Sequence, residues 1–101
     1  MKDRNIYTIE EIKEKAKNVF MNKEYIDRVY LFGSYAKNSA RPDSDLDFVV
    51  RVNSSVGMKL YELYDEINDV FGKSTDILTE KEILSLMPKT YMKDRILIYE
   101  H

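Results

Sequence analysis

Residues 32–48 of the chain read FGSYAKNSARPDSDLDF and join two short apolar runs. Gly33 and Ser34 stand at one end of this stretch, and Asp45 and Asp47 stand at the other. In an extended strand, residues i and i+2 point to the same face, so the two carboxylates would lie roughly 6.6 Å apart on one side. Such a pair repels itself, and Asp is depleted in strands. We therefore expect this pair to serve a function other than packing.

Each end of the stretch suits one half of a site for a nucleotide and a metal ion. Hard divalent cations take oxygen ligands and commonly combine one or two carboxylates with substrate phosphates, which favours Asp45 and Asp47 as ligands. Gly33 permits close approach of the backbone, and the free N–H groups of a following helical turn, expected over Tyr35–Ser39, point at an anion. The stretch thus predicts a phosphate site at Gly33 and Ser34 beside a metal site.

A calcium-binding loop is the sharpest alternative for the carboxylates. Asp43, Asp45 and Asp47 fall at positions 1, 3 and 5 of an EF-hand loop. Position 6 would then be Phe48 instead of Gly, and position 12 would be Ser54 instead of Glu. The pattern excludes an EF-hand but leaves metal binding in place.

The spacing of these residues resembles a known signature. Gly33 and Ser34, followed after ten residues by Asp45-Leu46-Asp47, resemble the signature of the DNA polymerase beta-type nucleotidyltransferases. The longer string GSYAKNSARPDSDLD is most similar to the minimal nucleotidyltransferases, stand-alone proteins that are often the antitoxin partners of HEPN toxins. The resemblance extends over nearly the whole chain. It implies a nucleotidyltransferase fold, with residues 1–101 as one domain.

The resemblance also implies a set of catalytic and metal-binding residues. Asp45 and Asp47 would hold two Mg²⁺ ions, and Asp76, on the strand after the intervening helix, would be the third catalytic carboxylate and metal ligand. Members of the family place their third acidic residue on such a strand. Taken alone, an Asp in a short strand such as Asp76 is more often an edge residue or a cap than a catalyst.

The nucleotide-binding side of the implied site lies in the glycine-containing stretch. Gly33 and Ser34 would grip the triphosphate of ATP, although Ser34 also suits a helix cap. Lys37 and Arg41 lie between the phosphate and metal ends and are candidates for nucleotide binding, with solvated surface charges as the alternative. Asn38 replaces a glycine often seen in relatives. Asn tolerates a left-handed backbone, so we expect the loop conformation to be kept.

By resemblance, the reaction is transfer of AMP from ATP to a hydroxyl group of a partner protein, with pyrophosphate leaving. The implied partner is a HEPN-type ribonuclease toxin, which the protein would neutralise as an antitoxin. Two alternatives remain: transfer to a small molecule such as an aminoglycoside, and an inactive nucleotide-binding scaffold. The complete carboxylate set argues against the scaffold, and the short chain argues against a separate domain for a small acceptor.

Composition limits the class of protein. The chain has 101 residues, of which 44% are hydrophobic and 34% charged, and no apolar run reaches the roughly 18 residues that span a membrane. Its formal net charge of −2 argues against tight direct binding to nucleic acid. It contains no cysteine, and its N-terminus lacks the pattern of a secretory signal. We therefore expect a cytoplasmic protein.

Hydrophobic periodicity predicts helices packed on a mixed sheet of about four strands, an α/β or α+β fold. Capping boxes at Thr8 and Thr79 predict helix starts, and Gly72 predicts a helix end. On the strand after Asp45, alternation places one apolar set in the core: Leu46, Phe48, Val50 and Val52. The expected helices run from Ile9 to about Met21, from a cap at Ser54 or Ser55 to Phe71, and over Ile83–Met87, with a further helical turn after Pro88. The expected strands are Val29–Ser34, Asp45–Val52, Ser74–Thr79 and Arg95–Tyr99.

Overall fold

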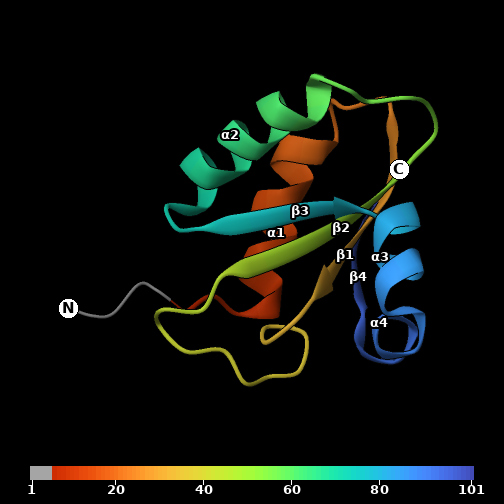
Figure 1. The fold of residues 1–101 in the computed structure, drawn as a ribbon. Helices are drawn as coiled ribbons and strands as arrows, with labels where there is room; N and C mark the ends of the chain where they lie inside the picture. Colours follow the sequence, from red (N-terminus) through yellow and green to blue (C-terminus); the bar gives the residue numbers. More distant parts are fainter. Residues whose placement is uncertain (1–5) are drawn as a thin grey trace.

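A computed structural model describes residues 6–101 and contains one four-stranded sheet with the strand order β3-β2-β1-β4 (Figure 1). Strand β1 pairs antiparallel with β2 and with β4, whereas β2 and β3 run parallel. The mixed sheet predicted from the sequence is thus confirmed. The elements in chain order are α1 (Ile9–Phe20), β1 (Ile26–Phe32), β2 (Leu46–Val52), α2 (Lys59–Phe71), β3 (Thr75–Thr79), α3 (Glu80–Leu86), α4 (Pro88–Asp94) and β4 (Ile96–Glu100).

Helices α1 and α2 cover one face of the sheet and form the larger core with it (Figure 1). Helix α1 begins at the predicted capping box, in which the Glu11 N–H donates to Thr8 Oγ1 over 3.1 Å and the Thr8 N–H donates to Glu11 Oε1 over 2.8 Å. Helix α2 ends at Gly72, whose φ of 64° is the left-handed value that glycine tolerates. The buried side chains of this core include Ile12, Ala16, Phe20, Leu31, Leu46, Phe48, Val50, Leu63, Ile67 and Phe71.

Helices α3 and α4 cover part of the opposite face. The predicted capping box at Thr79 and Glu82 opens α3, and a second buried cluster forms from Tyr30, Val49, Ile83 and Tyr91. Val49 lies on this face, as the alternation of β2 predicts, yet it is only 1% exposed. The part of β2 that lies under α3 and α4 is therefore buried on both faces. Outside this part, the same face of the strand carries polar side chains.

The start of α2 differs from the sequence prediction. Neither Ser54 nor Ser55 caps the helix, which begins at Lys59 without a side-chain cap. The first N–H groups instead bond to backbone carbonyls three residues earlier, from Lys59 to Val56 over 2.8 Å and from Leu60 to Gly57 over 3.2 Å. A tight turn of this kind satisfies the N–H groups that a capping side chain would otherwise take.

Other segments also depart from the predicted bounds, since β1 begins three residues earlier, at Ile26, and α3 begins at Glu80. The expected helical turn over Tyr35–Ser39 is a run of hydrogen-bonded turns, in which the Lys37 N–H donates to the Gly33 carbonyl over 3.1 Å but no helix continues. The single helical turn expected after Pro88 is the seven-residue helix α4. Proline is accepted there because the first helical position needs no intrahelical N–H bond. None of the helices in residues 6–101 combines the length and apolar character needed to cross a bilayer.

A charged network ties α3 and α4 to the sheet. Glu80, at the start of α3, accepts hydrogen bonds from Arg51 Nε over 2.7 Å, from the Tyr91 hydroxyl over 2.9 Å and from Arg95 Nη1 over 3.0 Å. Arg95 also lies with its guanidinium carbon 4.3 Å from the centre of the Tyr30 ring. Burial by itself raises the pKa of Glu80, but the hydrogen bonds from Arg51 and Tyr91 and the nearby cations hold it below its usual value.

We predict that Glu80→Ala lowers the free energy of unfolding by roughly 2–3 kcal/mol, because it leaves a half-buried cation and the Tyr91 hydroxyl without their acceptor. Urea titration at neutral pH measures the loss. Since the pKa of Glu80 is lower in the folded state, its contribution is present above the ordinary value of 4.5 and fades as the pH falls below it. The exposed neighbour Lys81→Ala is the control and should change stability little.

Candidate active site

The backbone at Gly33 directly supports the carboxylate of Asp47. Strand β1 ends at Phe32, which pairs with Asp47 on β2, and the chain then turns at Gly33 with a φ of 76°. A Cβ atom at Gly33 would lie 2.3 Å from Asp47 Oδ2. Both the left-handed backbone and the missing side chain are therefore needed for Asp47 to keep its place.

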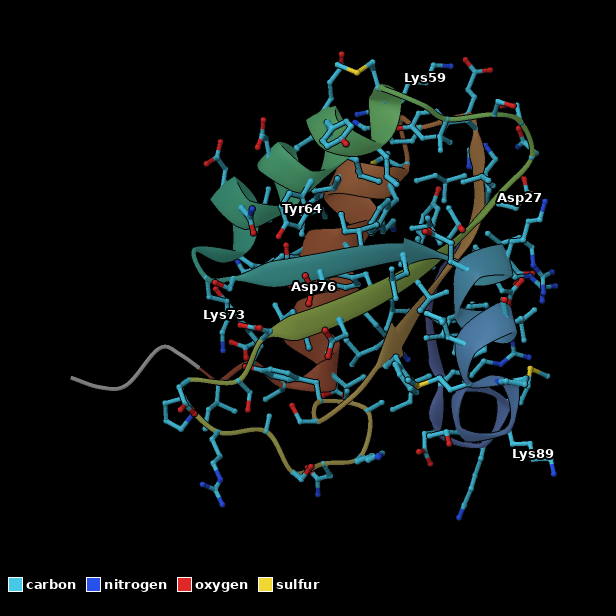
Figure 2. The ribbon with its side chains drawn as sticks, in the orientation of Figure 1. Asp27, Lys59, Tyr64, Lys73, Asp76 and Lys89 are labelled. Atoms are coloured by element: carbon cyan, nitrogen blue, oxygen red, sulfur yellow. The ribbon has the colours of Figure 1, made fainter. Side chains whose placement is uncertain are left out.

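The parallel pairing of β2 with β3 places Asp47 opposite Asp76. Thr75, the preceding residue of β3, points to the α2 side, where its hydroxyl donates to Asn68 Oδ1 over 2.7 Å. Because side chains alternate along a strand, Asp76 projects from the other face, away from α1 (Figure 2). Asp47 and Asp76 thus share the open face of the sheet.

Asp45 completes the acidic group from a position just before β2, where it is exposed. Burial raises the pKa of Asp47 to about 6, and the negative charges of Asp76 and then Asp45 add to that rise. The structure therefore brings together the three carboxylates that the sequence singled out. Their catalytic roles stay predictions.

The donor set fits a hard divalent cation in part. Within residues 6–101, no group of three or more Asp, Glu or His side chains is arranged to ligate one metal ion. Mg²⁺, however, commonly takes only one or two carboxylates and completes its shell with water and substrate phosphates. Burial is the main cause of the raised pKa of Asp47, and the repulsion from Asp76 and Asp45 that adds to it is what a bound cation would relieve. Carboxylate oxygens at adjoining strand positions therefore suit Mg²⁺ when a substrate supplies the remaining ligands.

The loop from Gly33 to Ser44 forms the lower border of the site (Figure 1). The Ser34 carbonyl accepts the Ser39 N–H over 2.9 Å, and Asn38 has the left-handed φ of 59° that the sequence predicts for it. Lys37 lies 3.7 Å from Asp94 of α4, and Arg41 is exposed. Ser34 directly follows Gly33 and is bonded within the loop, whereas the Lys37 side chain reaches toward α4.

Lys73 is a residue of this region that sequence reasoning missed. It precedes β3, and its Nζ donates to the Tyr35 hydroxyl over 2.7 Å and to the Pro42 carbonyl over 3.4 Å. These bonds hold the loop against the chain between α2 and β3. A lone lysine after the glycine that ends a helix carries no pattern that would have revealed this contact.

A cavity of about 390 Å³ lies beside the carboxylates. Asp47 and Asp76 form its polar side, and its remaining walls are mostly apolar and come from the sheet and α3: Phe32, Phe48, Val49, Ile77, Leu78, Ile83, Leu86 and Met87. An apolar cavity with a few convergent polar groups is the usual form of a site for a small ligand.

The sequence profile of the family described as polymerase beta, nucleotidyltransferase matches residues 14–101. The chain belongs to the polymerase beta nucleotidyltransferase family. A candidate protein adenylyltransferase of Methanocaldococcus jannaschii is 37% identical over 90 residues, which cover 88% of this chain and 90% of that protein. A second candidate protein adenylyltransferase of that organism is 31% identical over 80 residues, covering 75% of this chain and 82% of its own.

Solved structures share the nucleotidyltransferase fold. A candidate minimal nucleotidyltransferase superposes with a TM-score of 0.74 at 24% identity, covering 89% of this chain and 95% of its own. A chain of a toxin–antitoxin crystal structure with AMP-PNP has a TM-score of 0.76 at 16% identity, and the match covers 88% of this chain and 73% of that one. A chain from the complex of a tri-AMPylated Shewanella oneidensis HEPN toxin with MNT antitoxin has a TM-score of 0.71 at 14% identity. This match covers 93% of the present chain and 74% of the other. At these identities the likeness concerns the fold.

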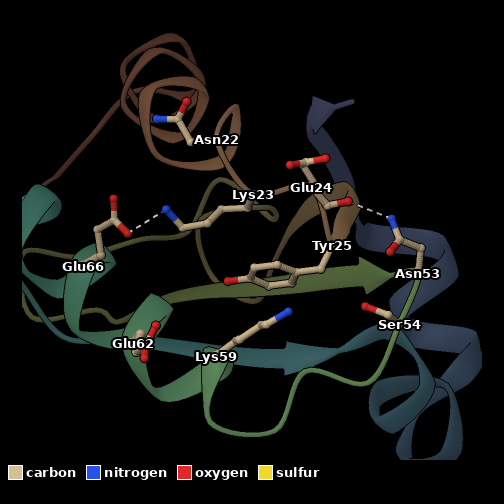
Figure 3. Close-up of a pocket in the computed structure, with 9 residues that line it drawn as sticks. All are labelled: Asn22, Lys23, Glu24, Tyr25, Asn53, Ser54, Lys59, Glu62 and Glu66. Atoms are coloured by element: carbon tan, nitrogen blue, oxygen red, sulfur yellow. Dashed lines mark hydrogen bonds and ion pairs between the residues drawn. The ribbon is translucent and has the colours of Figure 1, made fainter.

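This nucleotidyltransferase also has a larger pocket of about 740 Å³, and Figure 3 shows the residues that line it. Both of its lysines are already engaged, because Lys23 Nζ lies 2.9 Å from Glu66 Oε1 and Lys59 Nζ lies 5.1 Å from the centre of the Tyr25 ring. None of the predicted site residues lines it. The smaller cavity beside Asp47 therefore remains the candidate active site.

We predict that Asp47→Asn raises the free energy of unfolding by roughly 1–2 kcal/mol at about pH 8 without metal, since it removes a charge that the fold disfavours. The pKa of Asp47 is about 6 in the folded state, compared with 3.8 for an ordinary Asp. The wild type therefore loses stability as the pH rises from the lower to the higher value. The gain in the variant should vanish below the lower value.

Urea titrations in EDTA across this pH range measure the difference between the two proteins. Asp43→Asn, on the exposed part of the same loop, is the control and should follow the wild type. An Asp47→Asn variant less stable than the wild type at about pH 8 would contradict the electrostatic account.

Proposed function

We propose that this protein is an Mg²⁺-dependent nucleotidyltransferase that moves AMP from ATP to a hydroxyl group of a partner protein. The observation that carries the proposal is the meeting of Gly33, Asp47 and Asp76 at neighbouring positions of three adjacent chain segments. Membership of the nucleotidyltransferase family and the likeness to candidate protein adenylyltransferases support it. The proposal places the activity in the cytoplasm, where ATP is available.

The nucleotide enters with its triphosphate toward Gly33 and Ser34. The missing Cβ at Gly33 lets the Asp47 carboxylate lie against the backbone beside the proposed phosphate site, and Arg41 lies on the same loop for the outer phosphates. Lys37 can join them by leaving its ion pair with Asp94, which at 3.7 Å on a half-exposed side chain is weak. This orientation leaves the α-phosphate over Asp47.

In the transfer step, the acceptor oxygen forms a bond to the α-phosphorus while the bond from that phosphorus to the bridging oxygen breaks. Pyrophosphate leaves with the electron pair of the broken bond, and Asp76 receives the proton of the acceptor hydroxyl. Reactions of this type depend mainly on positioning and on neutralising charge.

Asp45, Asp47 and Asp76 would hold the metal ions, with Asp76 contributing from the acceptor side of the site. Bound Mg²⁺ would neutralise the triphosphate and stabilise the charge of the attacking and leaving oxygens. The chain itself contributes carboxylates whose repulsion favours cation binding.

The proposed acceptor is a HEPN-type ribonuclease toxin. Structural neighbours include an antitoxin bound to an AMPylated HEPN toxin, which supports a partner of this class. AMP on a hydroxyl of such a toxin adds negative charge and bulk, and both can exclude RNA phosphates from its active site. The protein would in this way act as an antitoxin.

We predict that incubation of this protein with ATP, Mg²⁺ and a HEPN-type product of the adjacent gene adds one or more AMP units to the partner. Intact-mass spectrometry of both chains measures the addition. Asp47→Asn should lower the rate at least about a hundredfold, because it removes a shared metal ligand. An unmodified partner together with a modified small molecule would replace the proposal by small-molecule transfer.

A second prediction concerns the metal without any turnover. Adding Mg²⁺ with a non-hydrolysable ATP analogue should raise the melting temperature of the wild type, because ligands that bind the folded state stabilise it. The rise should shrink strongly in Asp45→Asn and in Asp47→Asn, and remain in Asp43→Asn. Equal nucleotide stabilisation in EDTA and in Mg²⁺ would contradict the assigned metal site.

A further inference from the structure

A second groove borders the active site on the outer side of β3. Its volume is about 520 Å³, and it is lined by α2, by the turn before α2 and by the start of α3. Two tyrosines of α2 form its wall: Tyr61 is 69% exposed and Tyr64 is 38% exposed. Figure 2 shows Tyr64 above β3, with Asp76 on the strand below it. The groove is thus an aromatic surface beside an edge strand.

This groove is continuous with the candidate active site. Asp76 and Ile77 line both the groove and the cavity beside Asp47. Strand β3 pairs with β2 on one side and is the last strand of the sheet on the other. A chain lying in the groove therefore reaches the reacting face by passing over the edge at Asp76.

The direction of the proposed reaction selects this side for the acceptor. The phosphate site at Gly33 follows β1, Asp47 lies on the neighbouring β2, and Asp76 lies on the outermost β3. In an in-line displacement, the attacking oxygen enters opposite the leaving group. When pyrophosphate leaves toward Gly33, the acceptor oxygen must come from the β3 side, where the groove is.

The charge around the groove indicates what kind of segment it takes. The charged side chains that line the groove are both carboxylates, Asp76 of β3 and Glu82 of α3. Asp65 follows Tyr61 by four residues and so shares its side of the helix. Exposed tyrosine faces attract Lys and Arg side chains, and the neighbouring carboxylates add to that attraction.

We propose that this groove binds an extended, basic segment of the acceptor protein, with a Lys or Arg side chain against Tyr61 and Asp65, and delivers the adjoining hydroxyl to Asp76. The inference rests on the proposed function, because it places the acceptor of that reaction. Extended segments bind along sheet edges and in neighbouring side-chain pockets in many peptide-recognition domains.

The test compares steady-state AMP transfer to the HEPN-type protein by the wild type, Tyr61→Ala and Asp65→Lys. Both variants should raise the KM for the acceptor protein at least about tenfold, since aromatic anchors and close charge pairs dominate such interfaces. Their kcat and their affinity for the ATP analogue, measured by calorimetry, should stay at the wild-type values. The acceptor KM of the wild type should also rise between about 50 mM and about 300 mM salt, and this dependence should weaken in Asp65→Lys.

Two controls match the size and charge of these changes elsewhere on the surface. Met92→Ala truncates an exposed apolar side chain on α4, and Glu14→Lys reverses an exposed charge on α1. Both should keep the wild-type KM. Unchanged KM in the groove variants, with transfer by the wild type intact, overturns the groove assignment alone. A lower KM in Asp65→Lys overturns the basic character of the segment, and a wild type that modifies no protein overturns the proposed function as well.

Discussion

The parallel pairing that sets Asp47 opposite Asp76 places two like charges side by side, so the rest of the fold must hold them there. The opposing force comes from the other face of β2, where Leu46, Phe48 and Val50 are buried against α1 and α2. A register slip of one residue would turn these side chains to the open face and the carboxylates into the core. Packing on the closed face therefore fixes the repulsive arrangement on the open one.

The open face owes its shape to the limited reach of α3 and α4. The bonds of Glu80 with Arg51, Tyr91 and Arg95 fasten both short helices over one part of the sheet, and α4 reaches the Gly33 loop, where Asp94 lies 3.7 Å from Lys37. Beside them, Asp47 and Asp76 remain accessible, and the loop after β1 borders the remaining side. The Glu80 network thus stabilises the small second core, and the two short helices that it fastens cover only part of the sheet.

The sequence predicted features whose causes are local. Both capping boxes, the helix end at Gly72 and the left-handed Asn38 depend on a few adjacent residues, and all are present in the structure. The candidate site was predictable because Asp45 and Asp47 contradict ordinary strand composition. The contact of Lys73 with the loop, the burial of Val49 and the tyrosine groove were not predictable in this way. Each depends on segments that are distant in sequence and meet only through strand order and helix packing.

Accessibility of the carboxylates has a chemical consequence for the proposed reaction. Water can reach a nucleotide on this face and can attack an activated phosphate. Tight binding of ATP is therefore of little use to the protein while no acceptor is bound. An acceptor protein lying along β3 would cover the same face and exclude water while it supplies the hydroxyl. Docking of the partner would then complete the enclosure that this small fold leaves unfinished, which ties transfer to the presence of the correct acceptor.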